Sequence, residues 1–214
     1  MIIEPKVRGF ICTTSHPEGC KENVRKQITY IKNLPKCNGP KKVLVIGAST
    51  GYGLASRIAS TYGCDAATVG VIFDKPASGS RTATAGWYNT AAFEEFASKD
   101  GYYAKTINGD AFSTEIKKQT IDLIKQELGQ IECVVYSLAA PKRTTSDGTT
   151  YTSVLKCTGE DFVNTTVDLK TKEIVEVTVP KATEQEIHDT IKVMGGEDWK
   201  DWMTALNEAG VLAE

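Results

Sequence analysis

Four short apolar runs, each followed by a segment with helical spacing, dominate the hydrophobic pattern of this chain. The runs span residues 43–46, 66–73, 102–107 and 131–138. They are almost continuous and rich in β-branched residues, which is typical of strands buried on both faces. We therefore predict an α/β fold with a doubly wound parallel sheet, in which right-handed crossovers place the strands in the order 3-2-1-4.

The loops that follow these four strands are expected to meet at one edge of the sheet. In a doubly wound sheet the ligand crevice lies at the carboxyl ends of the strands where the strand order reverses, here strands one and four. We expect four short loops to face that crevice, namely residues 47–52, 73–74, 110–111 and 138–139.

The first of these loops connects a strand to a helix and contains three glycines. Gly47 allows a tight exit from the strand, Gly51 allows backbone N–H groups to approach a pyrophosphate, and Gly53 allows the helix to pack against the strand. The N-terminus of the helix would then face the phosphates. Glycines are common in loops for steric reasons alone, so the order of strand, turn and helix is what favours a Rossmann-like dinucleotide site.

Asp74 ends the second strand, about twenty residues after the glycines, where dinucleotide-binding proteins place an acid on the adenosine ribose. A carboxylate at that position accepts hydrogen bonds from the ribose hydroxyls and repels a 2′-phosphate. We therefore predict that the chain binds NADH in preference to NADPH.

Two further segments near the predicted crevice have candidate roles. Asp110 directly follows the third strand, so it could hydrogen-bond the adenine or, as an ordinary loop carboxylate, cap the following helix. Ser113 is also expected to cap that helix. Residues 75–85 form a long polar crossover, which is a candidate for folding over a ligand.

The N-terminal region precedes this repeat and has a less regular pattern. Loose alternation over residues 1–12 predicts a short strand or hairpin, and residues 23–33 have the spacing of a helix. His16 lies beside a proline. It is more readily explained as a capping or packing residue than as a catalytic base.

Beyond Pro141 the alternation of strand and helix stops. We predict a charged turn at residues 142–148 and a β-hairpin over residues 162–179, as a lid or substrate lobe. Thr183 and Glu186 have the spacing of a capping box, which predicts the start of a helix.

The last predicted helix contains Trp199 and Trp202, whose spacing indicates core packing rather than a substrate platform. We therefore predict a single cofactor-binding domain. Its parts are an N-terminal hairpin and helix (1–40), a core (41–140), a hairpin excursion (141–182) and C-terminal helices (183–214).

Composition narrows the class of partner. At 214 residues and a net charge of -2, the chain has no basic cluster alternating with aromatics, so nucleic acid is not an expected partner. The N-terminus is too short and charged for a signal peptide, and no apolar run approaches a membrane span, so we expect a cytoplasmic protein. The six scattered cysteines are expected to be reduced. Cys12, His16 and Cys20 fit no zinc spacing, so no metal site is predicted.

Six segments from the start of the chain to its last helix are specific when taken together. They are VRGFICTTSHPEGC, GPKKVLVIGASTGYGLASR, TAGWYN, INGDAF, VVYSLAAP and VMGGEDW. With them the chain resembles the N-terminal half of the trans-2-enoyl-CoA reductases, a family that includes an enoyl-acyl-carrier-protein reductase of bacterial fatty-acid synthesis.

The resemblance implies a Rossmann core similar to that of the short-chain dehydrogenases and NADH as the cofactor. It also implies reduction of the C2–C3 double bond of an enoyl thioester, carried by CoA or by an acyl carrier protein. Carried over by residue, the cofactor contacts of the family fall on Gly47, Ala48, Ser49, Thr50, Gly51, Tyr52, Phe73, Asp74, Asp110, Ala111, Leu138 and Ala139.

The chain departs from the family pattern in its catalytic residues. The family uses a tyrosine and a lysine separated by eight residues, and none of the eight tyrosines here has a lysine at that spacing or at the spacing of three found in superfamily relatives. The resemblance places this pair, and a strand beside strand four, beyond Glu214. Without that strand, we expect strand four to be left as an open edge with unpaired backbone groups. We therefore expect a truncated chain with no catalytic residues and negligible reductase activity, because a donor to the thioester oxygen is missing.

Two other functions are compatible with these residues. The chain could be a catalytically inactive NAD(H)-binding regulator, which the absent tyrosine–lysine pair permits. A ketoreductase of the wider superfamily is disfavoured because its Tyr-x-x-x-Lys is absent. A reading frame that continues into Tyr-x8-Lys would favour the reductase over the regulator.

Overall fold

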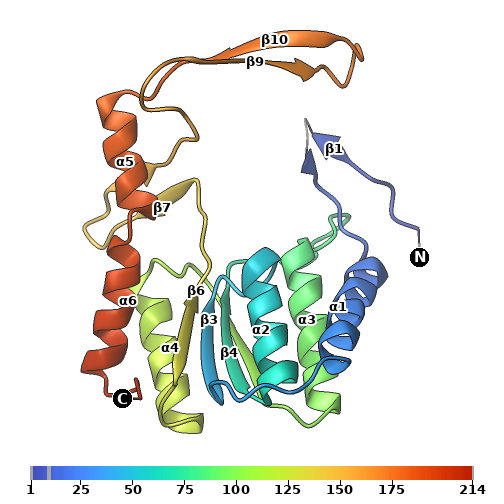
Figure 1. Ribbon diagram of the computed structural model, residues 1–214, viewed down its shortest axis with the longest axis vertical. Helices are drawn as coiled ribbons and strands as arrows, with labels where there is room; N and C mark the ends of the chain where they lie inside the picture. Colours follow the sequence, from blue (N-terminus) through green and yellow to red (C-terminus); the bar gives the residue numbers. More distant parts are fainter. Residues whose placement is uncertain (1, 9–10, 214) are drawn as a thin grey trace. The chain divides into compact units, whose positions relative to one another are not determined.

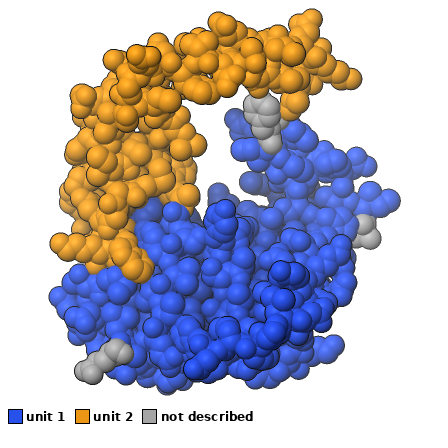
Figure 2. All heavy atoms as spheres, in the orientation of Figure 1, with its two compact units in different colours: residues 1–138, 202–214 blue, residues 139–201 orange. Residues whose placement is uncertain are grey.

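The computed structural model describes residues 2–8 and 11–213, and the chain divides into two compact units (Figure 2). The first, which we call the sheet unit, comprises residues 1–138 and 202–214. The second, the hairpin unit, comprises residues 139–201. The predicted excursion at 141–182 therefore lies within a unit that extends into the predicted C-terminal helices.

The sheet unit contains a four-stranded parallel sheet in the order β5-β4-β3-β6. In chain order these are the third, second, first and fourth strands, so the predicted α/β fold and strand order are confirmed. Three of the strands are shorter than their apolar runs, whereas β3 begins one residue before its run, at Lys42. Their bounds are β3 Lys42–Ile46, β4 Ala67–Ile72, β5 Ala104–Asn108 and β6 Cys133–Tyr136.

Helices cover both faces of this sheet (Figure 1). Leu44 and Ile46 pack in one core cluster with α4 and the end of α6, while Val43 and Val45 face the opposite side. All four side chains are fully buried, as expected for a strand between two helical layers. The helices of this unit are α1 Pro17–Lys32, α2 Gly51–Cys64, α3 Ala85–Lys99, α4 Thr114–Glu127 and the final residues of α6 Glu197–Glu208.

A buried arginine connects α2 to the edge strand β5. The guanidinium of Arg57 donates to Thr106 Oγ1 and to the Lys105 carbonyl, both at 2.7 Å. It passes under β4 at Gly70, where a Cβ would lie 2.5 Å from Arg57 Nη1. Burial lowers the pKa of Arg57 to about 10. The glycine at this strand position therefore makes room for the arginine.

The N-terminal segment forms the predicted hairpin, with β1 Val7–Arg8 antiparallel to β2 Ile11–Cys12. Residues 9–10, between the two strands, lie outside the described residues. Helix α1 begins at Pro17 rather than at residue 23. Proline favours the first helical position because its missing N–H is not needed there. His16 caps this helix, because its Nδ1 accepts a bond from Gly19 N at 3.2 Å, so the predicted capping role is confirmed.

The fourth strand has backbone pairing on its outer side, where the sequence had predicted an open edge. Ile131 and Leu212 form a parallel bridge just before β6. Ile131 N donates to the Val211 carbonyl, and Ala213 N donates to the Ile131 carbonyl, both at 2.8 Å. The expectation of an unpaired edge is therefore corrected at the start of the strand. The bonds arise because the turn after α6 returns residues 211–213 to the sheet.

The hairpin unit contains two antiparallel hairpins and a helix. The predicted hairpin at 162–179 is confirmed, as β9 Phe162–Val167 pairs with β10 Ile174–Val179. The predicted turn at 142–148 is instead a short hairpin of β7 Lys142–Thr144 and β8 Thr150–Thr152, which turns through Gly148 at a φ of 86°. The predicted capping box is also confirmed at the start of α5 Glu184–Met194.

Candidate functional site

The four predicted loops leave the same edge of the sheet. The register sets Ile46 opposite Val71 and Tyr136, and Ile72 opposite Asn108. Because the strands are parallel, residues 47–52, 73–74, 110–111 and Leu138 all follow the carboxyl ends. Ala139 is the next residue in the chain and is the first of the hairpin unit.

The glycine turn after β3 is constrained by backbone on two sides. Gly47 has a φ of 85°, and a Cβ there would lie 2.1 Å from the Ser137 carbonyl oxygen. A Cβ on Gly53 would lie 1.9 Å from the Gly47 carbonyl oxygen, so strand and helix approach as closely as the fingerprint requires. Gly51, with a φ of 53°, has nothing within 4 Å of its Cβ position. The outer side of the turn is therefore open.

The N-terminus of α2 is arranged to receive an anion. Its N-cap residue, Thr50, makes no capping bond with its side chain. The first backbone N–H groups of an α-helix have no partner within the helix, and the helix dipole favours negative charge there. Tyr52 is 89% exposed and leaves this end uncovered. The residues thus fit the pyrophosphate of a dinucleotide.

A buried asparagine that sequence reasoning did not select supports the glycine turn. Asn89 in α3 donates from Nδ2 to the Ser49 carbonyl at 3.1 Å. Asn89 is 7% exposed, so this bond is largely shielded from water. Asn89 is the last residue of the TAGWYN segment, so the family resemblance was the signal that could have pointed to it.

Asp74 is held through its backbone by the neighbouring strand. Its N–H donates to Asn108 Oδ1, and Asn108 Nδ2 donates to the Asp74 carbonyl, both at 2.9 Å. Its carboxylate accepts a bond from the hydroxyl of Thr84 at 2.7 Å. The adjacent Phe73 is 75% exposed and offers an apolar surface at the same edge.

The structure excludes one of the two roles that the sequence left open for Asp110, because Asp110 does not cap the following helix. Ser113 is the N-cap of α4, as predicted, and its Oγ accepts from Ile116 N at 3.2 Å. Asp110 instead accepts from Phe112 N at 3.0 Å through Oδ1, which closes a local turn before the helix. The hydroxyl of Ser113 therefore supplies the cap, and the Asp110 carboxylate orders the loop.

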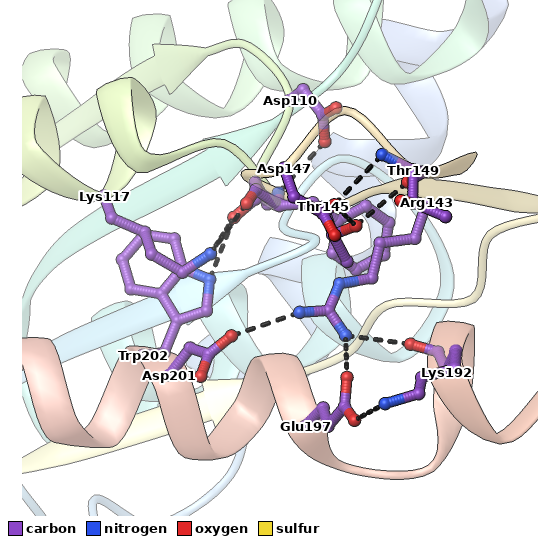
Figure 3. A network of polar contacts seen from close by, with 12 residues as sticks. Asp110, Lys117, Arg143, Thr145, Asp147, Thr149, Lys192, Glu197, Asp201 and Trp202 are labelled. Atoms are coloured by element: carbon purple, nitrogen blue, oxygen red, sulfur yellow. Dashed lines mark hydrogen bonds and ion pairs between the residues drawn. The ribbon is translucent and has the colours of Figure 1, made fainter. Parts of the chain in front are cut away.

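Two buried donors bond the backbone carbonyls of the loop that follows Asp110 (Figure 3). Lys117 Nζ lies 3.1 Å from the Ala111 carbonyl and 3.0 Å from the Phe112 carbonyl. The indole Nε1 of Trp202 donates to the same Ala111 oxygen at 3.1 Å. Trp202 is fully buried, which confirms its predicted core packing, whereas Trp199 is half-buried. The contact between Trp202 and the Ala111 loop was not predicted.

The described part of the chain has neither a membrane-spanning helix nor a cluster of metal ligands. None of its helices combines the length and hydropathy needed to cross a bilayer. Within residues 2–8 and 11–213, no group of three or more His, Cys, Asp or Glu side chains is arranged to hold a metal ion.

Comparisons with known proteins identify this arrangement. Residues 2–79 match the family model described as the NAD(P)H binding domain of trans-2-enoyl-CoA reductase. Residues 81–214 match the model described as the trans-2-enoyl-CoA reductase catalytic region. Together the two matches cover almost the whole chain.

Individual relatives agree with these matches. The chain is 60% identical to the NADH-dependent enoyl-acyl-carrier-protein reductase of Cytophaga hutchinsonii and 58% identical to the trans-2-enoyl-CoA reductase (NADH) of Ruminiclostridium cellulolyticum. Each alignment covers 100% of this chain and 54% of the relative, so the chain spans about half the length of these proteins.

Solved structures show the same relationship. The trans-2-enoyl-CoA reductase of Clostridium acetobutulicum, crystallised with NADH, superposes with a TM-score of 0.94 at 44% identity, over 100% of this chain and 54% of that one. The Treponema denticola enzyme with NAD gives a TM-score of 0.92 at 47% identity, over 100% and 55% of the two chains. From the family models, the relatives and the shared fold, we conclude that this chain belongs to the trans-2-enoyl-CoA reductase family.

Proposed function

We propose that this chain is the cofactor-binding half of an NADH-dependent reductase of trans-2-enoyl thioesters, carried by CoA or by an acyl carrier protein. The observation that carries the proposal is the glycine turn after β3. It is closed by backbone on its inner side at Gly47 and Gly53 and open at Gly51. A dinucleotide phosphate fits this turn because the first backbone N–H groups of α2 have no partner within the helix and the helix dipole favours negative charge there.

In this proposal each loop would hold one part of the cofactor. The amides between Ile46 and Leu54 would hold the pyrophosphate, and the carboxylate of Asp74 would hold the adenosine ribose. Phe73 and the loop of Asp110 and Ala111 would hold the adenine. Leu138 and Ala139, which follow the strand at the reversal of strand order, remain for the nicotinamide half.

Bound NADH supplies a hydride for C3 of the enoyl thioester. The residues of this chain bind and orient the cofactor, and the resemblance places the tyrosine and lysine that serve the thioester oxygen outside residues 1–214. Losing one positioned donor of this kind commonly lowers the rate by about a hundredfold to a thousandfold. We therefore propose that the chain alone has negligible reductase activity.

The binding proposal is tested by calorimetric titration of NADH and NADPH. We expect the chain to bind NADH more tightly than NADPH. Asp74→Ala should lower the affinity for NADH by about tenfold or more, which is the effect of losing hydrogen bonds to a charged group. Asp122→Ala is the matched control, because that carboxylate lies on the exposed surface of α4. The proposal is wrong if folded protein does not bind NADH and Asp74→Ala changes nothing.

The proposed absence of catalysis is tested separately by following NADH oxidation with crotonyl-CoA. We expect no rate above that of buffer. Robust turnover by the 214-residue chain would show that residues 81–214, which match the catalytic-region model, contain the catalytic groups.

We also propose a reducing, cytoplasmic setting. All six cysteines carry free thiols, two of which, Cys12 and Cys37, are among the exposed ones. Exposed thiols of this kind persist where glutathione and thioredoxin keep them reduced.

A further inference from the structure

Helix α3 begins against the carboxylate of Asp74. Its N-cap residue, Thr84, makes no capping bond with its own side chain. An N-cap threonine normally accepts a bond from a backbone N–H of the first helical turn. Here the hydroxyl instead donates to Asp74 Oδ1 at 2.7 Å.

The surroundings of this hydroxyl direct its hydrogen toward Asp74. Thr84 Oγ1 accepts a bond from Lys75 N at 3.3 Å, so one of its lone pairs is used. The competing acceptor for its hydrogen, the Lys75 carbonyl, is 3.4 Å away, considerably farther than the carboxylate. The shorter bond, to a charged acceptor, is the stronger one.

Gly86, in the first turn of α3, provides the space for the carboxylate. A Cβ at this position would lie 2.4 Å from both Asp74 Oδ1 and Oδ2. The residue is buried and helical, and its backbone is outside the positive-φ region. Alanine is generally favoured over glycine in a helix. The backbone therefore gives no reason for glycine here, and the position of the Asp74 carboxylate does.

We propose that Thr84 and Gly86 are positioning residues that set the NADH preference of this chain by fixing the Asp74 carboxylate. This inference rests on the proposed binding of the adenosine ribose by Asp74. Thr84 orients one carboxylate oxygen from one side, and Gly86 allows both oxygens to lie over the start of α3. The negative charge is also favoured near the N-terminus of that helix.

The groups beside Asp74 explain why its position would decide specificity. A cavity of about 310 Å³ is lined by Lys75, Arg81 and Thr84, among others. Cations and hydroxyls of this kind attract a phosphate, whereas the Asp74 carboxylate repels it. A variant in which this carboxylate is displaced or removed should therefore bind NADH more weakly and NADPH more tightly.

The role of the Thr84 hydroxyl is tested by a pair of substitutions in the 214-residue chain. Thr84→Val removes the hydroxyl with little change of shape, and Thr84→Ser retains it. We expect Thr84→Val to lower the ratio of NADH to NADPH affinity by about tenfold, the effect of losing one bond to a charged group. Thr84→Ser should keep the ratio of the unsubstituted chain. Equal ratios in the two variants would overturn the role of Thr84.

The role of Gly86 is tested by a double-mutant cycle with Asp74. Gly86→Ala alone should lower both the melting temperature and the affinity ratio, because its Cβ displaces the carboxylate. In the Asp74→Ala background the obstructing oxygens are gone, so Gly86→Ala should leave the ratio unchanged and raise the melting temperature through helix propensity. The inference is wrong if Gly86→Ala has the same effect in both backgrounds.

The outcomes separate this inference from the proposed function. If Asp74→Ala does not weaken NADH, the assignment of the ribose to Asp74 fails, and the inference fails with it. If Asp74→Ala weakens NADH while Thr84→Val and Gly86→Ala leave the ratio intact, only the positioning role fails. Should Gly86→Ala not fold alone yet fold with Asp74→Ala, the steric part of the inference is supported.

Discussion

Strands β3 and β10 are both rich in β-branched residues, yet β3 is buried and β10 is largely exposed. In β3 all of Val43, Leu44, Val45 and Ile46 are fully buried, whereas in β10 Ile174 is 76% exposed and Val177 is 39% exposed. Strand β3 lies between two helical layers, whereas β10 and β9 form a two-stranded sheet. Residue type therefore predicts a strand in both places, but the covering elements decide how much apolar area is removed from water.

The largest effect should come from the same substitution made in both strands. Ile46→Ala removes a fully buried side chain from the core cluster of the sheet unit and should lower the free energy of unfolding by about 2–5 kcal/mol. Ile174→Ala removes a side chain that is largely in water and should change it by less than about 0.5 kcal/mol. Urea denaturation measures both, and similar losses would contradict the comparison.

The hairpin unit should depend on Arg143 rather than on its exposed strands. The Arg143 guanidinium is 5% exposed and donates to the Lys192 carbonyl at 2.8 Å, to Glu197 at 3.0 Å and to Asp201 at 3.1 Å (Figure 3). Arg143→Met should cost about 1–3 kcal/mol, toward the lower end because Glu197 and Asp201 are partly solvated.

Hydrogen exchange distinguishes a loss of stability confined to the hairpin unit from a loss of stability of the whole chain. After Arg143→Met, amides of residues 142–201 should exchange faster while those of β3 and β4 stay protected. Arg25→Met is the control, because Arg25 pairs with Glu22 on the exposed surface of α1. In the unsubstituted chain we also expect weaker protection after Pro141 than in the first three strands, and uniformly strong protection there would contradict the contrast.

A smaller effect is expected from the donor behind the Ala111 loop. Trp202→Phe keeps most of the buried ring but removes the Nε1–H that bonds the Ala111 carbonyl. The substitution should lower the free energy of unfolding by about 1–2 kcal/mol. It should also lower the affinity for NADH, because the Asp110 loop loses one of its hydrogen bonds. Trp199→Phe, in the same helix, is the control. An unchanged NADH affinity in Trp202→Phe would show that Lys117 alone holds the loop.

The smallest effect concerns acid stability of the sheet unit. Lys32, with a contribution from Tyr62, lowers the pKa of Asp100 below its ordinary value of 3.8. The carboxylate therefore stabilises the fold above that value, and the contribution is lost as the pH falls through the lower pKa of the folded state. Asp100→Asn should reduce the loss in free energy of unfolding between pH 5 and pH 3 by about 0.5 kcal/mol, a small value because the pair is partly exposed. Thermal melts between pH 5 and pH 3 measure it.

The local signals in the sequence were sufficient for most of the sheet unit. Continuous apolar runs predicted the four strands and their order, and the capping roles of His16, Ser113 and Thr183 were correct. These features depend on residues close in the chain or on general rules of connection. The strand order also predicted which loops lie at the carboxyl ends of the strands, so these loops could be named as the candidate site without any knowledge of their contacts.

The support of the site could not be predicted because it depends on residues far apart in the sequence. Trp202 bonds Ala111 across 91 positions, and Asn89 bonds Ser49 across 40. Thr84 would be interpreted from sequence as a simple helix cap, and only the position of Asp74 reveals where its hydroxyl points. The β7–β8 hairpin was missed because its short strands are rich in threonine and lack an apolar alternation.

The crowding at Gly47 and Gly53 also limits how this protein can evolve. Every side chain added at either position would collide with main chain, which cannot move aside as a flexible side chain can. Selection therefore has almost no variation to act on at this turn, where we propose that the phosphates bind. In the same proposal, heritable change in nucleotide preference would come from the end of β4 and the first turn of α3, where a methyl group at Gly86 would collide with the Asp74 carboxylate.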